Sequence, residues 1–201
     1  MQVCIQHMES VQVRENRDGG EIVIQIAPNG DIAVSGYVRN ASLWSIQTGE
    51  LLHTLPGHRS FVTKASFTYD SSRVLTMDGD THAKIWDVST GNLLHYFGIG
   101  PSIVHSIEYS SDASMFVAGC EDSRVRLWDA TTGGLLKTFE GHTDRVWNVA
   151  FSPDMTKIAS GSYDGEVKIW DVGSMQCLRT LKHETLHVYS LTFSPDSAKI
   201  V

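Results

Sequence analysis

Three side-chain types that can together perform nucleophilic catalysis stand at a regular spacing in this sequence. His142, Ser160 and Asp164 supply a base, a hydroxyl and a carboxylate, the three groups of a serine-type triad. A second copy lies upstream and consists of His58, Thr76 and Asp80. An active site is needed only once and with one nucleophile, so the duplication and the change from serine to threonine favour a structural role over hydrolysis.

Both copies lie inside a longer repeat that ends in tryptophan. Successive tryptophans are 42 residues apart, at Trp44, Trp86, Trp128 and Trp170. The stretch 164–171, which ends in Trp-Asp, recurs at 80–87 and 122–129, with a degenerate copy at 41–45. In the last complete unit, apolar-alternating segments separated by turn residues occupy 146–151, 157–162, 167–172 and 177–181. Four short strands at a period of about 40 to 45 residues are typical of a propeller blade.

Composition excludes several classes of protein. The chain has 201 residues, 41% of them hydrophobic, so it can bury a sizeable core. Its net charge of −7 gives no long-range attraction for nucleic acid. Three cysteines without zinc-type spacing indicate a reducing compartment, and we find neither a signal peptide nor an apolar run long enough to span a membrane.

Several short motifs recur together in a fixed order. They are Gly-His at 57–58 and 141–142, Phe-Ser-Pro-Asp at 151–154 and 193–196, Ser-Gly-Ser-x-Asp at 160–164, and the repeated Trp-Asp. In this combination the chain resembles the WD-repeat β-propeller family, the transducin-like repeat proteins. The resemblance implies an all-β fold in which blades of four antiparallel strands are set around a central channel. We expect four complete blades and part of a fifth, an open or incomplete propeller.

The repeat divides the chain into six segments. We expect an N-terminal strand or loop at 1–20, able to serve as the outer strand of a neighbouring blade, then a degenerate blade 1 at 21–56, blade 2 at 57–98, blade 3 at 99–140, blade 4 at 141–182 and a partial blade 5 at 183–201. Two explanations for the incomplete set remain open: the chain is a fragment of a longer protein, or it closes by dimerisation. Open blade edges would also favour self-association.

The family resemblance gives the triad-like residues another meaning. It implies a buried tetrad in which the indole of Trp170 donates to Ser160, the hydroxyl to His142, and the imidazole to Asp164. Blade 2 would repeat the tetrad with His58, Thr76, Asp80 and Trp86. Blade 3 has Gly100 and Ala118 at the histidine and serine positions, which would leave Asp122 and Trp128 without this network. Blade 1 has Val34, Val38 and Ser45 at the serine, aspartate and Trp-Asp positions. We therefore expect blades 2 and 4 to be rigid, and blade 1 and the end of the chain to fray first.

Residues on the rim are the candidates for partner binding. In this family the loop before the first strand and the turn between the second and third strands commonly carry ligand contacts. The matching positions are Phe61, Ile103, His105, Glu121, Arg145, Trp147, Tyr163, His187 and Tyr189. Trp147 lies outside the repeating tryptophan position, and exposed Trp, Tyr and Arg are enriched in binding hot spots. The alternative is that Trp147 packs against a neighbouring blade.

The sequence thus predicts a non-enzymatic scaffold that presents a rigid rim to protein or peptide partners. It predicts no cofactor, no metal site, no nucleic-acid partner and no membrane association, and an intracellular location in the cytoplasm or nucleus. The spacing of His183 and His187 is not matched by a third metal ligand nearby. Two alternatives remain: the propeller portion of a larger enzymatic or signalling protein, and, less favoured, a hydrolase that uses Ser160 and His142.

Overall fold

The structure, a computed structural model, describes residues 23–79, 81–182 and 187–201. The chain divides into two compact units, with the boundary between Gly98 and Ile99. Sixteen strands are assigned in the described residues, and none of these residues forms a helix that could cross a membrane. The all-β class predicted from the sequence is confirmed.

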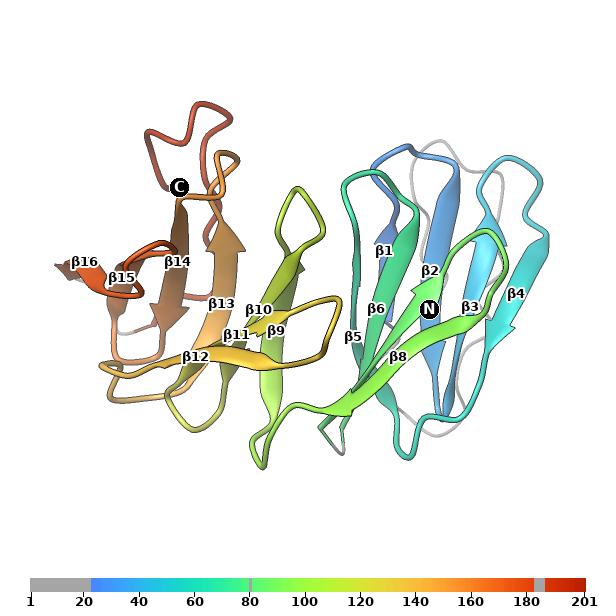
Figure 1. Ribbon diagram of the computed structural model, residues 1–201, viewed down its shortest axis with the longest axis horizontal. Helices are drawn as coiled ribbons and strands as arrows, with labels where there is room; N and C mark the ends of the chain where they lie inside the picture. Colours follow the sequence, from blue (N-terminus) through green and yellow to red (C-terminus); the bar gives the residue numbers. More distant parts are fainter. Residues whose placement is uncertain (1–22, 80, 183–186) are drawn as a thin grey trace. The chain divides into compact units, whose positions relative to one another are not determined.

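The first unit contains two four-stranded sheets (Figure 1). The first sheet consists of β1 (Val23–Ile26), β2 (Ile32–Tyr37), β3 (Asn40–Ser45) and β4 (Leu51–Leu55). The second sheet consists of β5 (Val62–Phe67), β6 (Arg73–Asp78), β7 (His82–Asp87) and β8 (Leu93–Gly98).

The second unit also contains two sheets, followed by residues 187–201. The third sheet consists of β9 (Val104–Tyr109), β10 (Met115–Cys120), β11 (Val125–Asp129) and β12 (Leu135–Phe139). The fourth sheet consists of β13 (Val146–Phe151), β14 (Lys157–Ser162), β15 (Glu166–Asp171) and β16 (Cys177–Lys182). In all four sheets each strand pairs antiparallel with the next one along the chain, as expected for propeller blades.

The turn between the first two strands of a sheet is fixed by a local side-chain hydrogen bond. In the fourth sheet Ser152 Oγ donates to Asp154 Oδ1 at 2.6 Å, and Met155 adopts a positive φ of 58°. This hydroxyl is the main cause that lowers the pKa of Asp154 to about 2. The same turn recurs in the third sheet with Ser110 and Asp112. Such serine and aspartate contacts compete well with regular secondary structure and therefore end the strand at a defined residue.

Neighbouring sheets within a unit pack closely because glycine occupies one position of the second strand. A Cβ atom on Gly119 would lie 2.8 Å from Val146 Cγ1, and one on Gly161 would lie 2.5 Å from Val188 Cγ1. In the first unit a Cβ on Gly36 would meet Val62 in the same way. The first strand of one sheet thus rests on the second strand of the preceding sheet.

The cores lie between these packed sheets. In the first unit Leu43 and Leu55 are buried with Trp86 of the second sheet. In the second unit Phe139 packs on Trp170, with ring centroids 5.1 Å apart. Within each unit, the outer strand of the first of the two sheets therefore contributes an apolar residue that packs with the tryptophan of the second.

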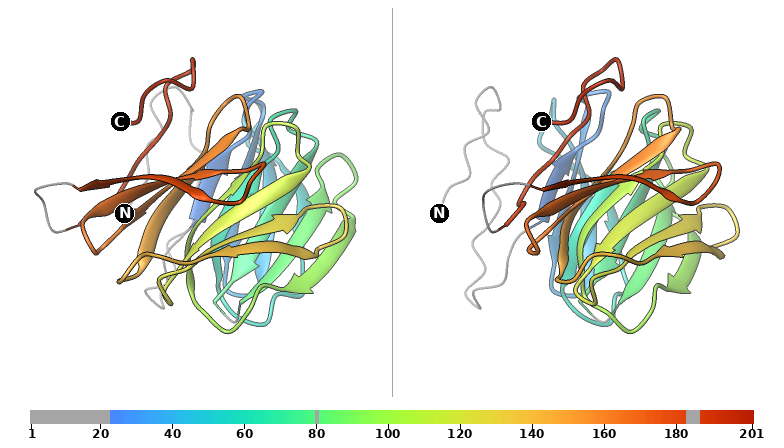
Figure 2. Two further views of the ribbon diagram at one scale, coloured as in Figure 1. Left: turned by 60° about the vertical axis from the view of Figure 1, so that its left-hand side comes forward. Right: turned by 90° about the vertical axis from the view of Figure 1, so that its left-hand side faces the viewer.

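Residues 187–201 continue the pattern beyond the fourth sheet (Figure 2). Leu191 is buried beside Ala150 and Ala159, and the backbone pairs between Thr192 and Val201 around a single bridge of Phe193 with Ile200. The sequence predicted a partial blade 5 at 183–201. The pairing in the structure is confined to this short hairpin, so the segment is the beginning of a fifth blade. The predicted strand or loop at 1–20 lies outside the described residues.

Candidate functional site

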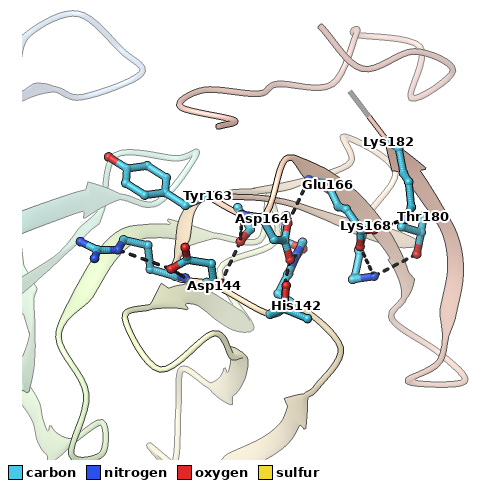
Figure 3. A network of polar contacts seen from close by, with 12 residues as sticks. His142, Asp144, Tyr163, Asp164, Glu166, Lys168, Thr180 and Lys182 are labelled. Atoms are coloured by element: carbon cyan, nitrogen blue, oxygen red, sulfur yellow. Dashed lines mark hydrogen bonds and ion pairs between the residues drawn. The ribbon is translucent and has the colours of Figure 1, made fainter. Parts of the chain in front are cut away.

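The triad-like residues of the fourth sheet form a closed hydrogen-bond chain. Trp170 Nε1 donates to Ser160 Oγ at 2.8 Å, Ser160 Oγ lies 2.8 Å from His142 Nε2, and His142 Nδ1 lies 2.9 Å from Asp164 Oδ2. Figure 3 shows the histidine and aspartate ends of this chain. Because indole only donates and a carboxylate only accepts, the protons must run from tryptophan to aspartate. β14 and β15 supply the serine and tryptophan, and the loop before β13 supplies the histidine.

The electrostatics of this tetrad favour a neutral histidine beside an ionised aspartate. Burial lowers the pKa of His142, although Asp164 opposes the shift. Burial would raise the pKa of Asp164, but the backbone N–H groups of Thr143 and Glu166, together with His142, outweigh it and lower the pKa. The loop before the first strand is thereby tied to the turn between the second and third strands.

The second sheet holds the same network with a different carboxylate. His58 Nε2 lies 2.8 Å from Thr76 Oγ1, Trp86 Nε1 donates to the same hydroxyl at 2.7 Å, and His58 Nδ1 lies 3.2 Å from Asp78 Oδ2. The sequence assigned Asp80 to this role, and Asp80 lies outside the described residues. Burial would raise the pKa of Asp78, but backbone N–H donors from His82 and Arg59 lower it. Counting from the tryptophan gives Asp80, whereas the carboxylate that contacts His58 in the structure lies two residues earlier, at the end of β6.

In the first sheet the tryptophan indole donates to a serine, although the sequence placed Val34 at the serine position. Trp44 Nε1 donates to Ser35 Oγ at 2.8 Å, whereas counting ten residues back from the tryptophan gives Val34. The reason is the register: Trp44 pairs with Ala33, eleven residues earlier, while Trp170 pairs with Ile158, twelve residues earlier. This hairpin is one residue shorter, so the serine moves by one position.

The third sheet has Gly100 and Ala118 at the histidine and serine positions of the tetrad, but its aspartate is still paired. Arg126 Nη1 donates to Asp122 Oδ1 at 3.0 Å, and Asp122 N donates to Ser102 Oγ at 3.0 Å. Trp128 stacks on Phe116 at a centroid distance of 5.1 Å. As expected, Asp122 and Trp128 take no part in a histidine–serine tetrad, but the sequence did not predict that an arginine on β11 pairs with Asp122 instead.

The tetrad geometry is unsuited to hydrolysis. The Ser160 side chain is fully buried, and its oxygen already accepts a hydrogen bond from Trp170. A nucleophilic oxygen must face a substrate and an oxyanion site. The tetrad therefore stabilises the blade.

A second arrangement lies at the other candidate positions, where aromatic side chains gather. His105, Trp147, Tyr163 and His187 form a column with successive ring centroids 4.5, 5.0 and 4.5 Å apart. Tyr189 stands nearly perpendicular to Trp147 and Tyr163, at 6.4 and 5.5 Å. Edge-to-face and stacked arrangements are the favourable geometries for aromatic pairs. We call these five residues the aromatic cluster.

Three charged side chains frame the aromatic cluster. Glu121 Oε2 lies 2.5 Å from His105 Nε2, and Glu121 Oε1 lies 3.5 Å from Arg145 Nη1. The Arg145 guanidinium carbon lies 5.2 Å from the centre of the Tyr163 ring, and its Nε lies 3.7 Å from Asp144 Oδ1. We call Glu121, Asp144 and Arg145 the polar frame.

Irregular pairing at the start of two strands directs two members of the cluster. Val146 pairs with Ser162 and Asn148 with Gly161, so Trp147 is the extra residue of a β-bulge. His105 is the extra residue of the matching bulge in the third sheet. Bulges redirect a side chain at the edge of a sheet. Periodicity cannot reveal such a bulge, because the extra residue does not change the repeat length.

Backbone contacts between loops bring the remaining members together. Tyr163 N donates to Arg145 O, Val188 N donates to Ser162 O, and His187 Nδ1 lies 3.0 Å from Tyr163 O. Glu121 N donates to Ile103 O, so Ile103 borders the frame and is 56% exposed. Phe61 belongs to the first unit, where it is 45% exposed. Of the nine predicted rim residues, seven thus make direct side-chain contacts with one another. The sequence did not predict Asp144 as a member of this group, because its only signal was a position next to Arg145.

One group in the described residues has ligand atoms close enough to surround a metal ion, within 4.8 Å of one another. It consists of His142, Asp164 and Glu166. These ligand atoms are already engaged, since His142 pairs with Asp164, and Glu166 accepts from Lys168 at 2.8 Å and contacts Lys182 at 3.2 Å (Figure 3). An ion would have to displace two lysines and the imidazole proton.

Comparison with known families supports the assignment of these sheets to WD repeats. The family profile described as "WD domain, G-beta repeat" matches four consecutive segments, which together cover more than half of the chain: 49–87, 91–129, 133–171 and 175–201. The chain belongs to the WD-repeat family. Each complete match ends at a Trp-Asp pair, so a WD repeat supplies the outer strand of one sheet and the first three strands of the next. No curated protein matches the sequence.

Proposed function

We propose that this chain is a non-enzymatic interaction module whose partner-binding surface is the aromatic cluster with its polar frame. WD repeats generally mediate protein–protein interaction. The observation that carries the proposal is the contact of seven predicted rim residues, drawn from two sheets and the segment that follows, in one cluster of the second unit.

The exposure of the cluster is suited to binding. Tyr189 is 58% exposed, while Trp147 and Tyr163 are half-buried and held by stacking. Tyrosine, tryptophan and arginine dominate hot spots because they contribute a large contact area at a low cost in side-chain entropy. The rings are already ordered, so a partner would not have to order them. Trp147 can both pack and bind a partner, since its ring stacks on Tyr163 and is still partly exposed to solvent.

We further propose an intracellular setting, in the cytoplasm or nucleus. Cys120 and Cys177 are free thiols, one buried and one exposed. An exposed free thiol is more common in a reducing compartment than in secreted proteins.

Quantitative affinity capture from cell lysate tests the proposed surface. The chain, a Trp147→Ala/Tyr189→Ala variant and a control are each used as bait, and captured proteins are compared by mass spectrometry. We expect a defined set of proteins to be lost with the double variant, because truncating hot-spot aromatics commonly costs 2 kcal/mol or more of binding energy. Melting temperatures of all baits are measured alongside.

The matched control removes exposed apolar side chains from outer strands. Leu136→Ala/Leu178→Ala truncates two residues that are 46% and 51% exposed on β12 and β16. These changes should leave the captured set unchanged. Equal losses with both variants, or no loss with either, would show that partners bind elsewhere or not at all.

A further inference from the structure

The polar frame carries more negative than positive charge. Glu121 and Asp144 are two carboxylates, with side chains 37% and 52% exposed, and Arg145 is the single guanidinium between them. Its contacts with them, at 3.5 and 3.7 Å, are longer than a hydrogen bond. Glu121 also contacts His105, and Asp144 also accepts from the Arg145 backbone N–H, but each carboxylate oxygen can accept more than one hydrogen bond, so both groups can still pair with a further cation.

The aromatic cluster already shows how it accepts a cation. The Arg145 guanidinium lies over the Tyr163 ring. Tyr189 presents a more exposed ring at right angles to this stack, close to Trp147. Cations are attracted to the faces of tyrosine and tryptophan, and the attraction increases when the site loses water.

The whole chain supports the same sign of partner. Its net charge of −7 attracts positive segments at long range and repels acidic ones. Such steering mainly raises the rate of association and suppresses partners of the wrong charge.

We infer that the partner segment recognised at this surface is a basic peptide, whose arginine or lysine side chain lies against Tyr189 and Trp147 and pairs with Glu121 and Asp144. This inference rests on the proposed function and specifies the chemistry of its partner. Acidic peptides would be repelled by two carboxylates that share one guanidinium, and uncharged proline-rich peptides would give those carboxylates no new charged partner.

Selection from a displayed library of random linear peptides on the intact chain tests this. Selected peptides are synthesised, and their dissociation constants are measured by fluorescence anisotropy at low and at physiological salt. We expect enrichment of arginine and lysine, and weaker binding as salt rises. Glu121→Gln/Asp144→Asn should weaken binding about tenfold, because two exposed charge pairs contribute up to about 1 kcal/mol each.

The neutral variants were chosen to preserve folding. Glutamine at 121 and asparagine at 144 keep an oxygen for His105 and for the Arg145 amide, which now donates to Asp144 Oδ1 at 2.7 Å. The matched control, Asp129→Asn/Asp171→Asn, removes the same charge from turns at the other end of the strands, where each aspartate accepts hydrogen bonds from its own turn. Its affinity should stay within about twofold of the unaltered chain.

Each other outcome overturns a definite statement. Cluster-dependent peptides that are acidic or proline-rich would refute the basic partner and leave the proposed function intact. Basic peptides weakened equally by both charge variants would reveal non-specific attraction and refute the site. If no peptide depended on Trp147 or Tyr189, both the inference and the proposed function would fail.

Discussion

The third and fourth sheets lie in one compact unit and have the same strand order, yet they fix the same turn by different means. In the fourth sheet Asp164 is held by His142 and by two backbone N–H groups. In the third sheet Asp122 is held by Arg126. The common requirement is an aspartate in the turn between the second and third strands with a donor to pair with it.

The third sheet could not adopt the histidine version by one substitution. Gly100, at the histidine position, has φ of +109°, a backbone conformation that side chains rarely adopt. Ala118 has no hydroxyl to link an imidazole to Trp128. The arginine solution reaches the aspartate from the neighbouring strand and needs neither group. The comparison teaches that, in these two sheets, a paired carboxylate in this turn is kept although only the fourth sheet keeps the tetrad.

The largest expected effect comes from breaking the tetrad. His142→Ala removes the partner of the Ser160 hydroxyl and one partner of Asp164, and should lower the free energy of unfolding of the second unit by about 3 kcal/mol. Chemical denaturation, with hydrogen exchange of the β14 amides, measures it. Thr143→Ala in the same loop is the control, since Thr143 contacts Asp164 through its backbone N–H. Equal effects of the two changes would contradict a structural role for the imidazole.

The two sheets should also respond to pH in opposite directions. Glu108 on β9 is buried enough that its pKa rises from 4.5 to about 7, although Phe151 N donates to it at 3.2 Å. The folded state then holds the proton more tightly than the unfolded chain, so stability falls as pH rises from 4.5 to 7 and stays low above 7. Glu108→Gln should therefore stabilise the protein at pH 8 by about 1 to 3 kcal/mol and change little below pH 4.5.

The histidine gives the opposite slope. Because the pKa of His142 is lowered on folding, the unfolded chain binds more protons, and stability is lost as pH falls below 6.5. Denaturation curves at several pH values separate the two groups. His142→Ala should reduce the loss of stability below pH 6.5, and Glu108→Gln should reduce the loss of stability between pH 4.5 and 7. The same pH profile for both variants would refute the assignment.

Removing the cation from each sheet sharpens the comparison further. Arg126→Met should cost about 2 kcal/mol, because it takes from Asp122 the group that outweighs burial and lowers its pKa. Lys168→Met, at the matching position, should cost less than about 1 kcal/mol, since Lys168 pairs with Glu166 and Asp164 keeps His142. Calorimetry of the two variants gives the difference. A larger loss of stability for Lys168→Met than for Arg126→Met would contradict the different roles given to the two side chains.

The smallest effect concerns the turn before β10. Ala113 has φ of 60°. Ala113→Gly relieves this strain but adds freedom to the unfolded chain, so we expect a gain of about 0.5 kcal/mol. Ala118→Gly, the same change inside buried β10, should instead cost about 1 kcal/mol. Thermal melts of both variants would decide, and a loss at Ala113 would mean that the turn carries no strain.

Much of the fold was predicted from the repeat. Counting residues back from each tryptophan identified the hydrogen-bonded residues only where the hairpin between the second and third strands has the same length. It located His142, Ser160, Asp164 and Trp170. It failed at Ser35, where the hairpin is one residue shorter, and it did not find Asp78, which contacts His58 while the predicted Asp80 lies outside the described residues. It could not identify Arg126 as the partner of Asp122, because the lysines at the matching positions, Lys84 and Lys168, bond to other groups.

The sequence by itself predicted the all-β class and the four antiparallel strands of each complete blade, because alternation and turn chemistry are local and recur every 42 residues. The tertiary structure decided which rim residues touch. Trp147 and His105 meet because bulges redirect them, and Tyr163 meets His187 because loops from separate segments bond to each other. These contacts depend on register and on packing between sheets, and a pattern read along one chain does not contain them.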